Sequence, residues 1–263
     1  MKQMNYIKIG AKVVLCAFIL ALAGCSKVGS SGNQSPQTVV VMLFDISGST
    51  SATAIRQRYQ KEFDTVLQEV GNNTVVMADR ITDNSLATSS FPVNITFPAY
   101  NMLEDSAMTH NKKMKKLHEE ADEQVKQIFS NTSKYPHTDL MNAFQLAAKV
   151  FNGDTAKGAK NKVLVVFSDM FEQSAHYNFV SLNLDKTKTQ QIVNKEKGEG
   201  TLPDLNGVKV WISGAGATGN SNIPSSKLNQ IRDFWLQYFK ATGADFSTTR
   251  YSASLINFSL PKD

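Results

Sequence analysis

Asp45, Ser47 and Ser49 occupy alternate positions directly after an apolar run, Val39 to Phe44. An apolar run bounded by polar chain on one side and by Gly and Ser on the other predicts a strand buried on both faces. One carboxylate and two hydroxyls therefore leave the end of this strand together. Ligands of an open parallel sheet bind at the carboxyl ends of its strands, and hard oxygen ligands suit a hard cation such as Mg2+.

Two further segments carry oxygen ligands in comparable places. Residues 163–167 form a second apolar run that ends in Ser168-Asp169, and Thr138 comes just before a helical pattern of apolar residues. In the doubly wound strand order 3-2-1-4-5-6, the first and fourth strands are neighbours at the switch point. This order places Asp45 beside Asp169. Thr138, from its place before the helical pattern, could serve the same cation.

The three segments together resemble the von Willebrand factor type A family, in which three loops form a metal-ion-dependent adhesion site. The resemblance rests on D-x-S-x-S from position 45, T-D-L from position 138 and S-D from position 168, and it covers residues 38–256. It implies that Ser47, Ser49 and Thr138 supply hydroxyl ligands. It also implies that Asp45 and Asp169 hold Mg2+ or Mn2+ directly or through water. An exposed Asp or Glu of a protein partner would then complete the shell of a cation held in a shallow cleft, at the exposed ends of the two strands.

One position departs from the family pattern. The family usually has Gly after the Asp of the third segment, whereas Met170 follows Asp169 here. Gly has free access to positive φ angles, so we expect this turn to be built differently. The alternative to a metal site is that Asp45 and Ser47 only cap a strand-to-helix turn, which is a common use of these residue types.

The N-terminus indicates the compartment. Three lysines precede an apolar core, Val13 to Leu22, that is too short to cross a bilayer and typical of a signal peptide. The sequence Leu22-Ala23-Gly24-Cys25 resembles the lipobox of bacterial lipoproteins, which implies cleavage after residue 24 and a lipid on Cys25. The serine after this cysteine resembles an outer-membrane sorting signal. We expect a lipid-anchored protein of the bacterial cell envelope, facing the periplasm or the cell surface; an uncleaved membrane helix is the alternative.

The chain divides into a signal peptide (1–24), a flexible Ser- and Gly-rich tether (25–37) and one domain (38–263). Cys16 leaves with the signal peptide, so we expect no disulfide. The signal peptide also removes three lysines and no acid, so 28 − 3 = 25 basic residues face 23 acidic ones, a net charge of +2. This near balance argues against a nucleic-acid partner.

Hydrophobic periodicity predicts an alternation of strands and helices. The expected strands are 38–45, 74–81, 91–97, 162–168, 207–213 and 247–256, and the expected helices are 52–70, 104–130, 139–151 and 225–242. This alternation predicts an α/β fold: a doubly wound, mostly parallel six-stranded sheet with helices on both faces. The strand flanked by Pro92 and Pro98 belongs at an edge and should be antiparallel to its predecessor.

Two segments have open interpretations. The connection from Met170 to Asn206 is long and contains a polar stretch of helix-like composition, 185–200. Its first part either shapes the ligand surface or is a variable surface insertion. The lysine-rich run 112–116 is expected to form a solvated, charge-paired helix face, with contact to membrane head groups as the alternative.

These features favour a binding module and not an enzyme. A metal-dependent phosphohydrolase is one alternative, because an Asp at the end of the first strand with Mg2+ also serves phosphoryl transfer. The haloacid dehalogenase pattern would need an acid where Ser47 stands. A solute-binding lipoprotein is another alternative, although that class has two lobes. The four histidines lack the spacing of a zinc site.

Overall fold

The computed structural model describes residues 35–103, 105–130, 135–217 and 222–261. The predicted signal peptide, Cys25 and most of the predicted tether lie outside these residues. Among the helices in the described ranges, none is both long enough and apolar enough to cross a membrane.

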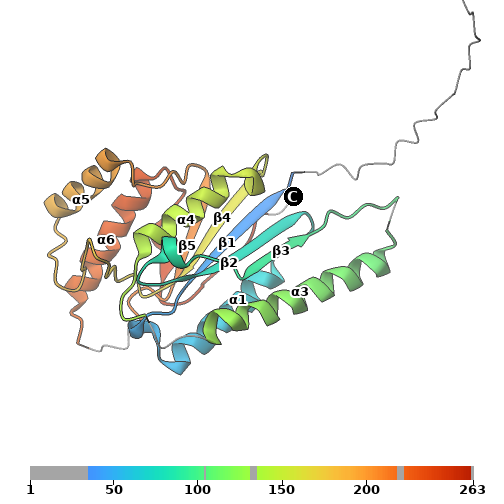
Figure 1. The fold of residues 1–263 in the computed structure, drawn as a ribbon, viewed down its shortest axis with the longest axis horizontal. Helices are drawn as coiled ribbons and strands as arrows, with labels where there is room; N and C mark the ends of the chain where they lie inside the picture. Colours follow the sequence, from blue (N-terminus) through green and yellow to red (C-terminus); the bar gives the residue numbers. More distant parts are fainter. Residues whose placement is uncertain (1–34, 104, 131–134, 218–221, 262–263) are drawn as a thin grey trace, which may run out of the picture. The chain divides into compact units, whose positions relative to one another are not determined.

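A six-stranded sheet with the order β3-β2-β1-β4-β5-β6 forms the centre of the domain (Figure 1). Its strands are β1 (Thr38–Asp45), β2 (Thr74–Ile81), β3 (Val93–Phe97), β4 (Asn161–Phe167), β5 (Val208–Ser213) and β6 (Tyr251–Ser252). β3 pairs antiparallel with β2, and every other pair is parallel. The predicted doubly wound order is confirmed, with the antiparallel strand at the edge.

Helices cover both faces of this sheet, as predicted. On one face lie α1 (Thr53–Gln68) and α3 (Ala107–Ser130); on the other lie α4 (Leu140–Asn152), α5 (Lys186–Glu199) and α6 (Ser225–Ala241). Alternate residues of β1 enter two separate cores: Val39, Val41 and Leu43 pack on the α4 side, and Val40, Met42 and Phe44 pack on the α1 side. A strand with apolar side chains on both faces is buried on both faces, which explains the unbroken apolar run.

The predicted strand 247–256 is mostly wrong. Only Tyr251–Ser252 pairs with β5, after a short 3-10 turn at Thr248–Arg250. Beyond Ser252 the chain turns away, and the N–H of Leu255 donates a hydrogen bond of 3.0 Å to Oε1 of Glu62 on α1. A side chain therefore satisfies this backbone donor in place of the neighbouring strand.

The structure also contains short elements that periodicity could not predict. The single-turn helix α2 (Ser85–Thr88) follows Asn84, whose side chain accepts the N–H of Ala87. One turn is too short to show a helical repeat. The helix-like stretch of the long connection forms α5, which begins after the N-cap Asp185 and ends at Gly200 with φ of 71°.

Candidate metal site at the carboxyl ends of β1 and β4

Three loops meet where β1 and β4 end. The two strands are adjacent and parallel, so the loop that follows β1 lies beside the loop that follows β4. The N–H of Gly48 donates a hydrogen bond of 3.1 Å to the carbonyl of Tyr135, in the loop before α4. Thr138 and Gln173 exchange two backbone hydrogen bonds of 3.0 and 2.8 Å. The three predicted ligand segments therefore lie on loops in direct contact.

Asp45 is buried, and both of its carboxylate oxygens accept hydrogen bonds. Oδ1 accepts from the N–H of Ser47 at 3.0 Å and from the hydroxyl of Thr50 at 3.4 Å. Oδ2 accepts from the hydroxyl of Ser168 at 2.7 Å. Burial raises the pKa of Asp45, and these hydrogen bonds oppose the rise. Because both oxygens have partners from the protein itself, Asp45 suits contact with an ion through water.

Asp169 is also buried, but one of its oxygens has no partner. Oδ1 accepts the N–H of Phe171 at 3.1 Å, whereas Oδ2 is buried without a hydrogen bond. Burial and then the negative charge of Asp45 raise the pKa of Asp169 to about 7. The Ser49 hydroxyl and the Phe171 N–H lower this pKa and so limit the rise. A buried polar atom without a partner costs about 1–3 kcal/mol. A hard cation would satisfy this oxygen, so the site fits Mg2+ or Mn2+.

The predicted hydroxyl ligands lie on the same loops. Oγ of Ser47 and Oγ of Ser49 are 3.3 Å apart, with Ser47 buried and Ser49 half-buried. Thr138 is buried as well. Within the described ranges no hydrogen bond joins its hydroxyl to the other four residues, so only the backbone contacts of its loop place it near them. The set has two carboxylates and three hydroxyls. A metal site made of three or more His, Cys, Asp or Glu side chains would be a different arrangement, and the part of the chain that the structure describes holds none.

Both carboxylates lie deeper than the sequence predicted. Asp45 and Asp169 are each 0% exposed, so the expectation that they lie at exposed strand ends is wrong. The neighbouring loop contacts Asp169: the N–H of Gly216 donates to the carbonyl of Asp169 at 3.1 Å, beyond the end of β5. Gly48 is exposed and Ser49 half-buried, so the first loop carries the accessible side of the site.

The turn after Asp169 keeps a glycine-like conformation, contrary to our expectation. Met170 has φ of 68°, in the left-handed region that costs a non-glycine residue about 1–2 kcal/mol. Two hydrogen bonds of 2.9 Å hold it there: its N–H donates to Oγ of Ser168, and its carbonyl accepts from Nε1 of Trp235. Its side chain is fully buried in the core, so packing offsets the backbone cost.

A glycine permits the close approach of the loop after β5. Gly214 has φ of 100°, and a Cβ at this position would meet the carbonyl oxygen of Ser168 at 2.8 Å and the hydroxyl of Tyr59 still closer. Only a residue without a side chain lets this loop pack against Ser168 and so close the site.

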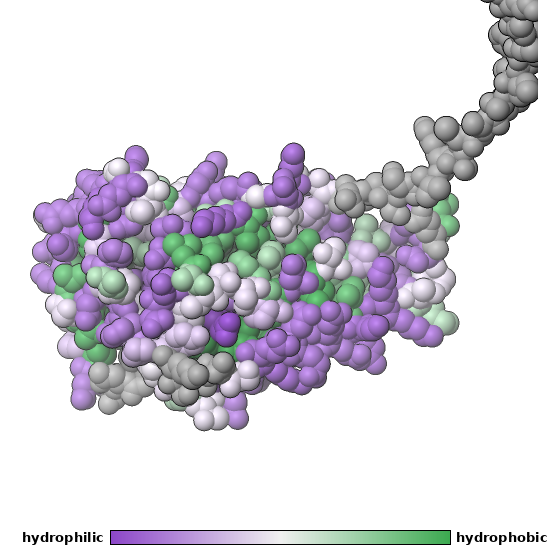
Figure 2. Space-filling model, in the orientation of Figure 1, coloured by the Kyte–Doolittle hydropathy of each residue, from purple (hydrophilic) through white to green (hydrophobic). Residues whose placement is uncertain are grey.

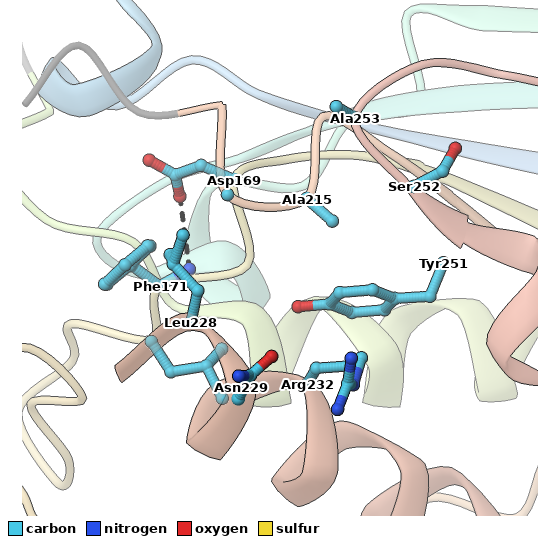
Figure 3. Close-up of a pocket in the computed structure, with 11 residues that line it drawn as sticks. Asp169, Phe171, Ala215, Leu228, Asn229, Arg232, Tyr251, Ser252 and Ala253 are labelled. Carbon is cyan, nitrogen blue, oxygen red and sulfur yellow. Dashed lines mark hydrogen bonds between the residues drawn. The ribbon is translucent and has the colours of Figure 1, made fainter. Parts of the chain in front are cut away.

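A pocket of about 260 Å³ adjoins Asp169 (Figure 3). Phe171 and Leu228 form apolar parts of its wall, and Arg232 and Tyr251 add polar groups. The ring of Tyr251 projects into the space between Asp169 and α6 (Figure 3). Burial, and then the charge of Asp169, raise the pKa of Tyr251, so its hydroxyl stays protonated.

Several residues of the site were not assigned from the sequence. Ser168 and Thr50 hold Asp45, and the only signal for them is their place within the two strand-end motifs. Glu172 is buried, and its Oε2 accepts the N–H groups of Leu140 at 2.7 Å and Met141 at 3.2 Å, at the start of α4. The sequence gives no sign of this link, because it joins residues 31 and 32 positions apart.

Comparison with known proteins gives structural matches only. No protein-family model matches the sequence, and no curated protein matches it. A von Willebrand factor type A structure from Catenulispora acidiphila aligns with a TM-score of 0.40 and 11% identity, covering 79% of this chain and 43% of that chain. The pilus adhesin SpaC from Lactobacillus rhamnosus GG aligns with a TM-score of 0.39 and 14% identity, covering 84% and 28%.

A third structure, proximal thread matrix protein 1 from the mussel byssus, has a TM-score of 0.36 and 15% identity, with 75% of this chain and 41% of that chain covered. This chain thus spans less than half the length of each of these solved chains. The likeness concerns the arrangement of strands and helices, and what those proteins bind is not carried over to this one.

Proposed function

We propose that residues 38–263 form a binding module of the von Willebrand factor type A kind, anchored in the bacterial envelope by a lipid on Cys25. The module captures a protein partner through Mg2+ or Mn2+. The proposed ligands are Asp45, Ser47, Ser49, Thr138 and Asp169. The observation that carries the proposal is Oδ2 of Asp169, a buried carboxylate oxygen without a hydrogen-bond partner, beside a second buried carboxylate.

The two carboxylates have different roles in this proposal. Asp45 is fixed by Ser47, Thr50 and Ser168, so it supplies charge and orients a water ligand. Asp169 has an open oxygen, so it is the direct carboxylate ligand. When bound, the dication would neutralise both charges and leave a coordination position for an Asp or Glu of the partner.

The surroundings of Asp169 favour an acidic partner. The guanidinium of Arg232 stands on the wall of the adjoining pocket, where it would attract a second oxygen or a neighbouring acid of the partner. This guanidinium also contacts Oδ1 of Asp233 at 3.1 Å, at a site where both side chains are partly exposed. Such an exposed pair has little net strength, so a partner carboxylate can compete for the arginine.

Capture from an envelope extract tests the proposal. The full chain is used as bait in Mg2+ and in EDTA, and we expect a partner to be retained in Mg2+ only. Asp169→Asn should lose that partner while circular dichroism shows a folded domain, and Asp154→Asn, an exposed acid elsewhere, should behave as wild type. Retention of the same partner by Asp169→Asn in EDTA would contradict a metal-bridged contact.

The absence of catalysis is also part of the proposal. Phosphatase assays with the purified chain in Mg2+ should show no turnover that depends on Asp45. Turnover that is lost in Asp45→Asn would favour the metal-dependent phosphohydrolase instead.

A further inference from the structure

The loop between β3 and α3 carries large apolar side chains in solvent. The exposed fractions are 39% for Tyr100, 80% for Met102, 96% for Leu103 and 70% for Met108. In the described ranges these are four of the six large apolar residues that are exposed, and they fall within nine consecutive positions. Apolar side chains gathered in this way mark a contact surface.

Lysines follow this loop on the first turns of α3. Lys112, Lys113, Lys115 and Lys116 are all exposed. Met108, Lys112 and Lys115 share one side of the helix, because their spacing is i, i+4 and i+7. The opposite side of α3 packs on the core through Ala121, Val125 and Ile128, so the lysine side is free of the domain. Two acids partly offset the positive charge of these lysines. Nζ of Lys115 lies 3.8 Å from Oε1 of Glu119, and Asp105 is half-buried at the loop.

The base of this loop is tied to the place where the chain enters the sheet. The N–H of Asn73 donates to the carbonyl of Pro98 at 3.1 Å, and the N–H of Gln37 donates to the carbonyl of Asn73 at 2.8 Å. His110 on α3 hydrogen-bonds the side chain of Asn72 at 2.7 Å. The loop, the start of α3 and the start of β1 therefore lie at one end of the domain (Figure 1).

This end is the amino end of β1, and the candidate metal site is at the carboxyl end. Cys25 precedes Ser35 by 35 − 25 = 10 residues. Ten residues span at most about 35 Å when fully extended. A lipid on Cys25 would therefore keep this end of the domain within about 35 Å of the bilayer.

We propose that four exposed apolar residues, Tyr100, Met102, Leu103 and Met108, and the exposed lysines on the first turns of α3 form a membrane-contact surface for an anionic bilayer. Tyr100, Met102, Leu103 and Met108 enter the interface, and the lysines of α3 lie at the level of the lipid phosphates. Apolar side chains beside a cationic helix face are the combination that such an interface binds. The surface rests on the lipid anchor of the proposed function but not on the metal site, so it and the metal-bridged contact can fail separately. Figure 2 shows hydrophobic atoms reaching the surface at the end of the domain where this loop lies.

The test measures the depth of the loop in a bilayer. The full chain, processed as the cell makes it, is reconstituted into phosphatidylcholine vesicles with and without phosphatidylglycerol. Leu103→Trp serves as the reporter and Ile256→Trp as the matched control, since Ile256 is 54% exposed outside the loop. We expect brominated lipids to quench the Leu103→Trp fluorescence several-fold more than the control, and more strongly with phosphatidylglycerol. Equal quenching of the two variants would overturn the proposal, and this is also the result expected if the loop binds a protein.

Charge reversal tests the lysines. Lys112→Glu combined with Lys115→Glu, introduced into the reporter, should remove the effect of phosphatidylglycerol on quenching. Lys186→Glu combined with Lys197→Glu on α5 is the control with the same charge change and should keep the effect. Circular dichroism shows whether each variant is folded. An effect of phosphatidylglycerol that survives the first pair, with the domain folded, would overturn the cationic part of the surface.

Discussion

The hydroxyl of Ser168 donates a hydrogen bond of 2.7 Å to Oδ2 of Asp45, from the end of β4 to the end of β1. The same oxygen of Ser168 accepts the N–H of Met170 at 2.9 Å. This residue therefore ties the two carboxylate loops together. It also gives Oδ2 of Asp45 a partner, whereas Oδ2 of Asp169 has none.

Binding of Mg2+ should stabilise the folded domain. A ligand that binds only the native state adds about 2.7 kcal/mol at a free concentration a hundred times its Kd. Melting temperatures in EDTA and in increasing Mg2+, measured on the full chain, give this effect. We expect Asp169→Asn to abolish the increase, because it removes the open carboxylate, and Asp154→Asn to preserve it. Equal melting temperatures of the wild-type chain in EDTA and in saturating Mg2+ would contradict an occupied site.

Glu172 should make the free energy of unfolding fall as pH rises. Burial, and then the charge of Asp139, raise its pKa to about 8 in the folded state, from a value of 4.5. The folded state then binds more protons than the unfolded state between these values, so the contribution is present below pH 4.5 and is lost as pH rises toward 8. One proton corresponds to about 1.4 kcal/mol per pH unit.

Denaturant unfolding at several pH values between these two limits measures the slope. Glu172→Gln keeps an acceptor for the N–H groups of Leu140 and Met141 and removes the titration, so its profile should be flatter than that of wild type. Glu199→Gln, an exposed residue of α5, is the control. Parallel profiles for wild type and Glu172→Gln would show that this carboxyl does not carry the slope.

Replacing Met170 by Ala and, in a second variant, by Gly should reveal the strain of the backbone at this position. Both Met170→Ala and Met170→Gly lose the buried side chain, a loss of about 2–5 kcal/mol for Met to Ala in a core. Only Gly occupies φ of 68° without cost, so the Gly variant should be more stable than the Ala variant by about 1 kcal/mol. Urea unfolding of the three proteins measures the difference. A Gly variant no more stable than the Ala variant would show that the turn is unstrained.

Cys25 should be the lipid attachment site. The small residues before it and the short apolar core match processing by cleavage and lipidation. Cys25→Ala should release the protein from the membrane fraction or leave the precursor uncut, as seen by fractionation and gel mobility. An unchanged distribution and size in that variant would mean that another feature anchors the chain.

The order of the elements could be predicted from the sequence, because each depends on local information. The unbroken apolar runs of β1 and β4 require burial on both faces, and the turns and helices between them require parallel strands. The neighbouring position of Asp45 and Asp169 follows from that order alone. The strand expected at 247–256 was wrong because its pairing depends on where the chain turns. Beyond that turn the N–H of Leu255 bonds to Glu62, which is 193 positions away in the sequence.

The sequence by itself thus determined which loops carry the candidate oxygen ligands and at which edge of the sheet these loops meet. The tertiary structure decided the burial and the hydrogen-bond partners of each candidate ligand. Oδ2 of Asp45 has a partner because Ser168, 123 positions away in the sequence, donates to it, and the loop after β5 packs against Ser168 and Asp169. Burial, charge repulsion and the left-handed turn at Met170 arise from such distant contacts, which a local pattern of residues does not encode.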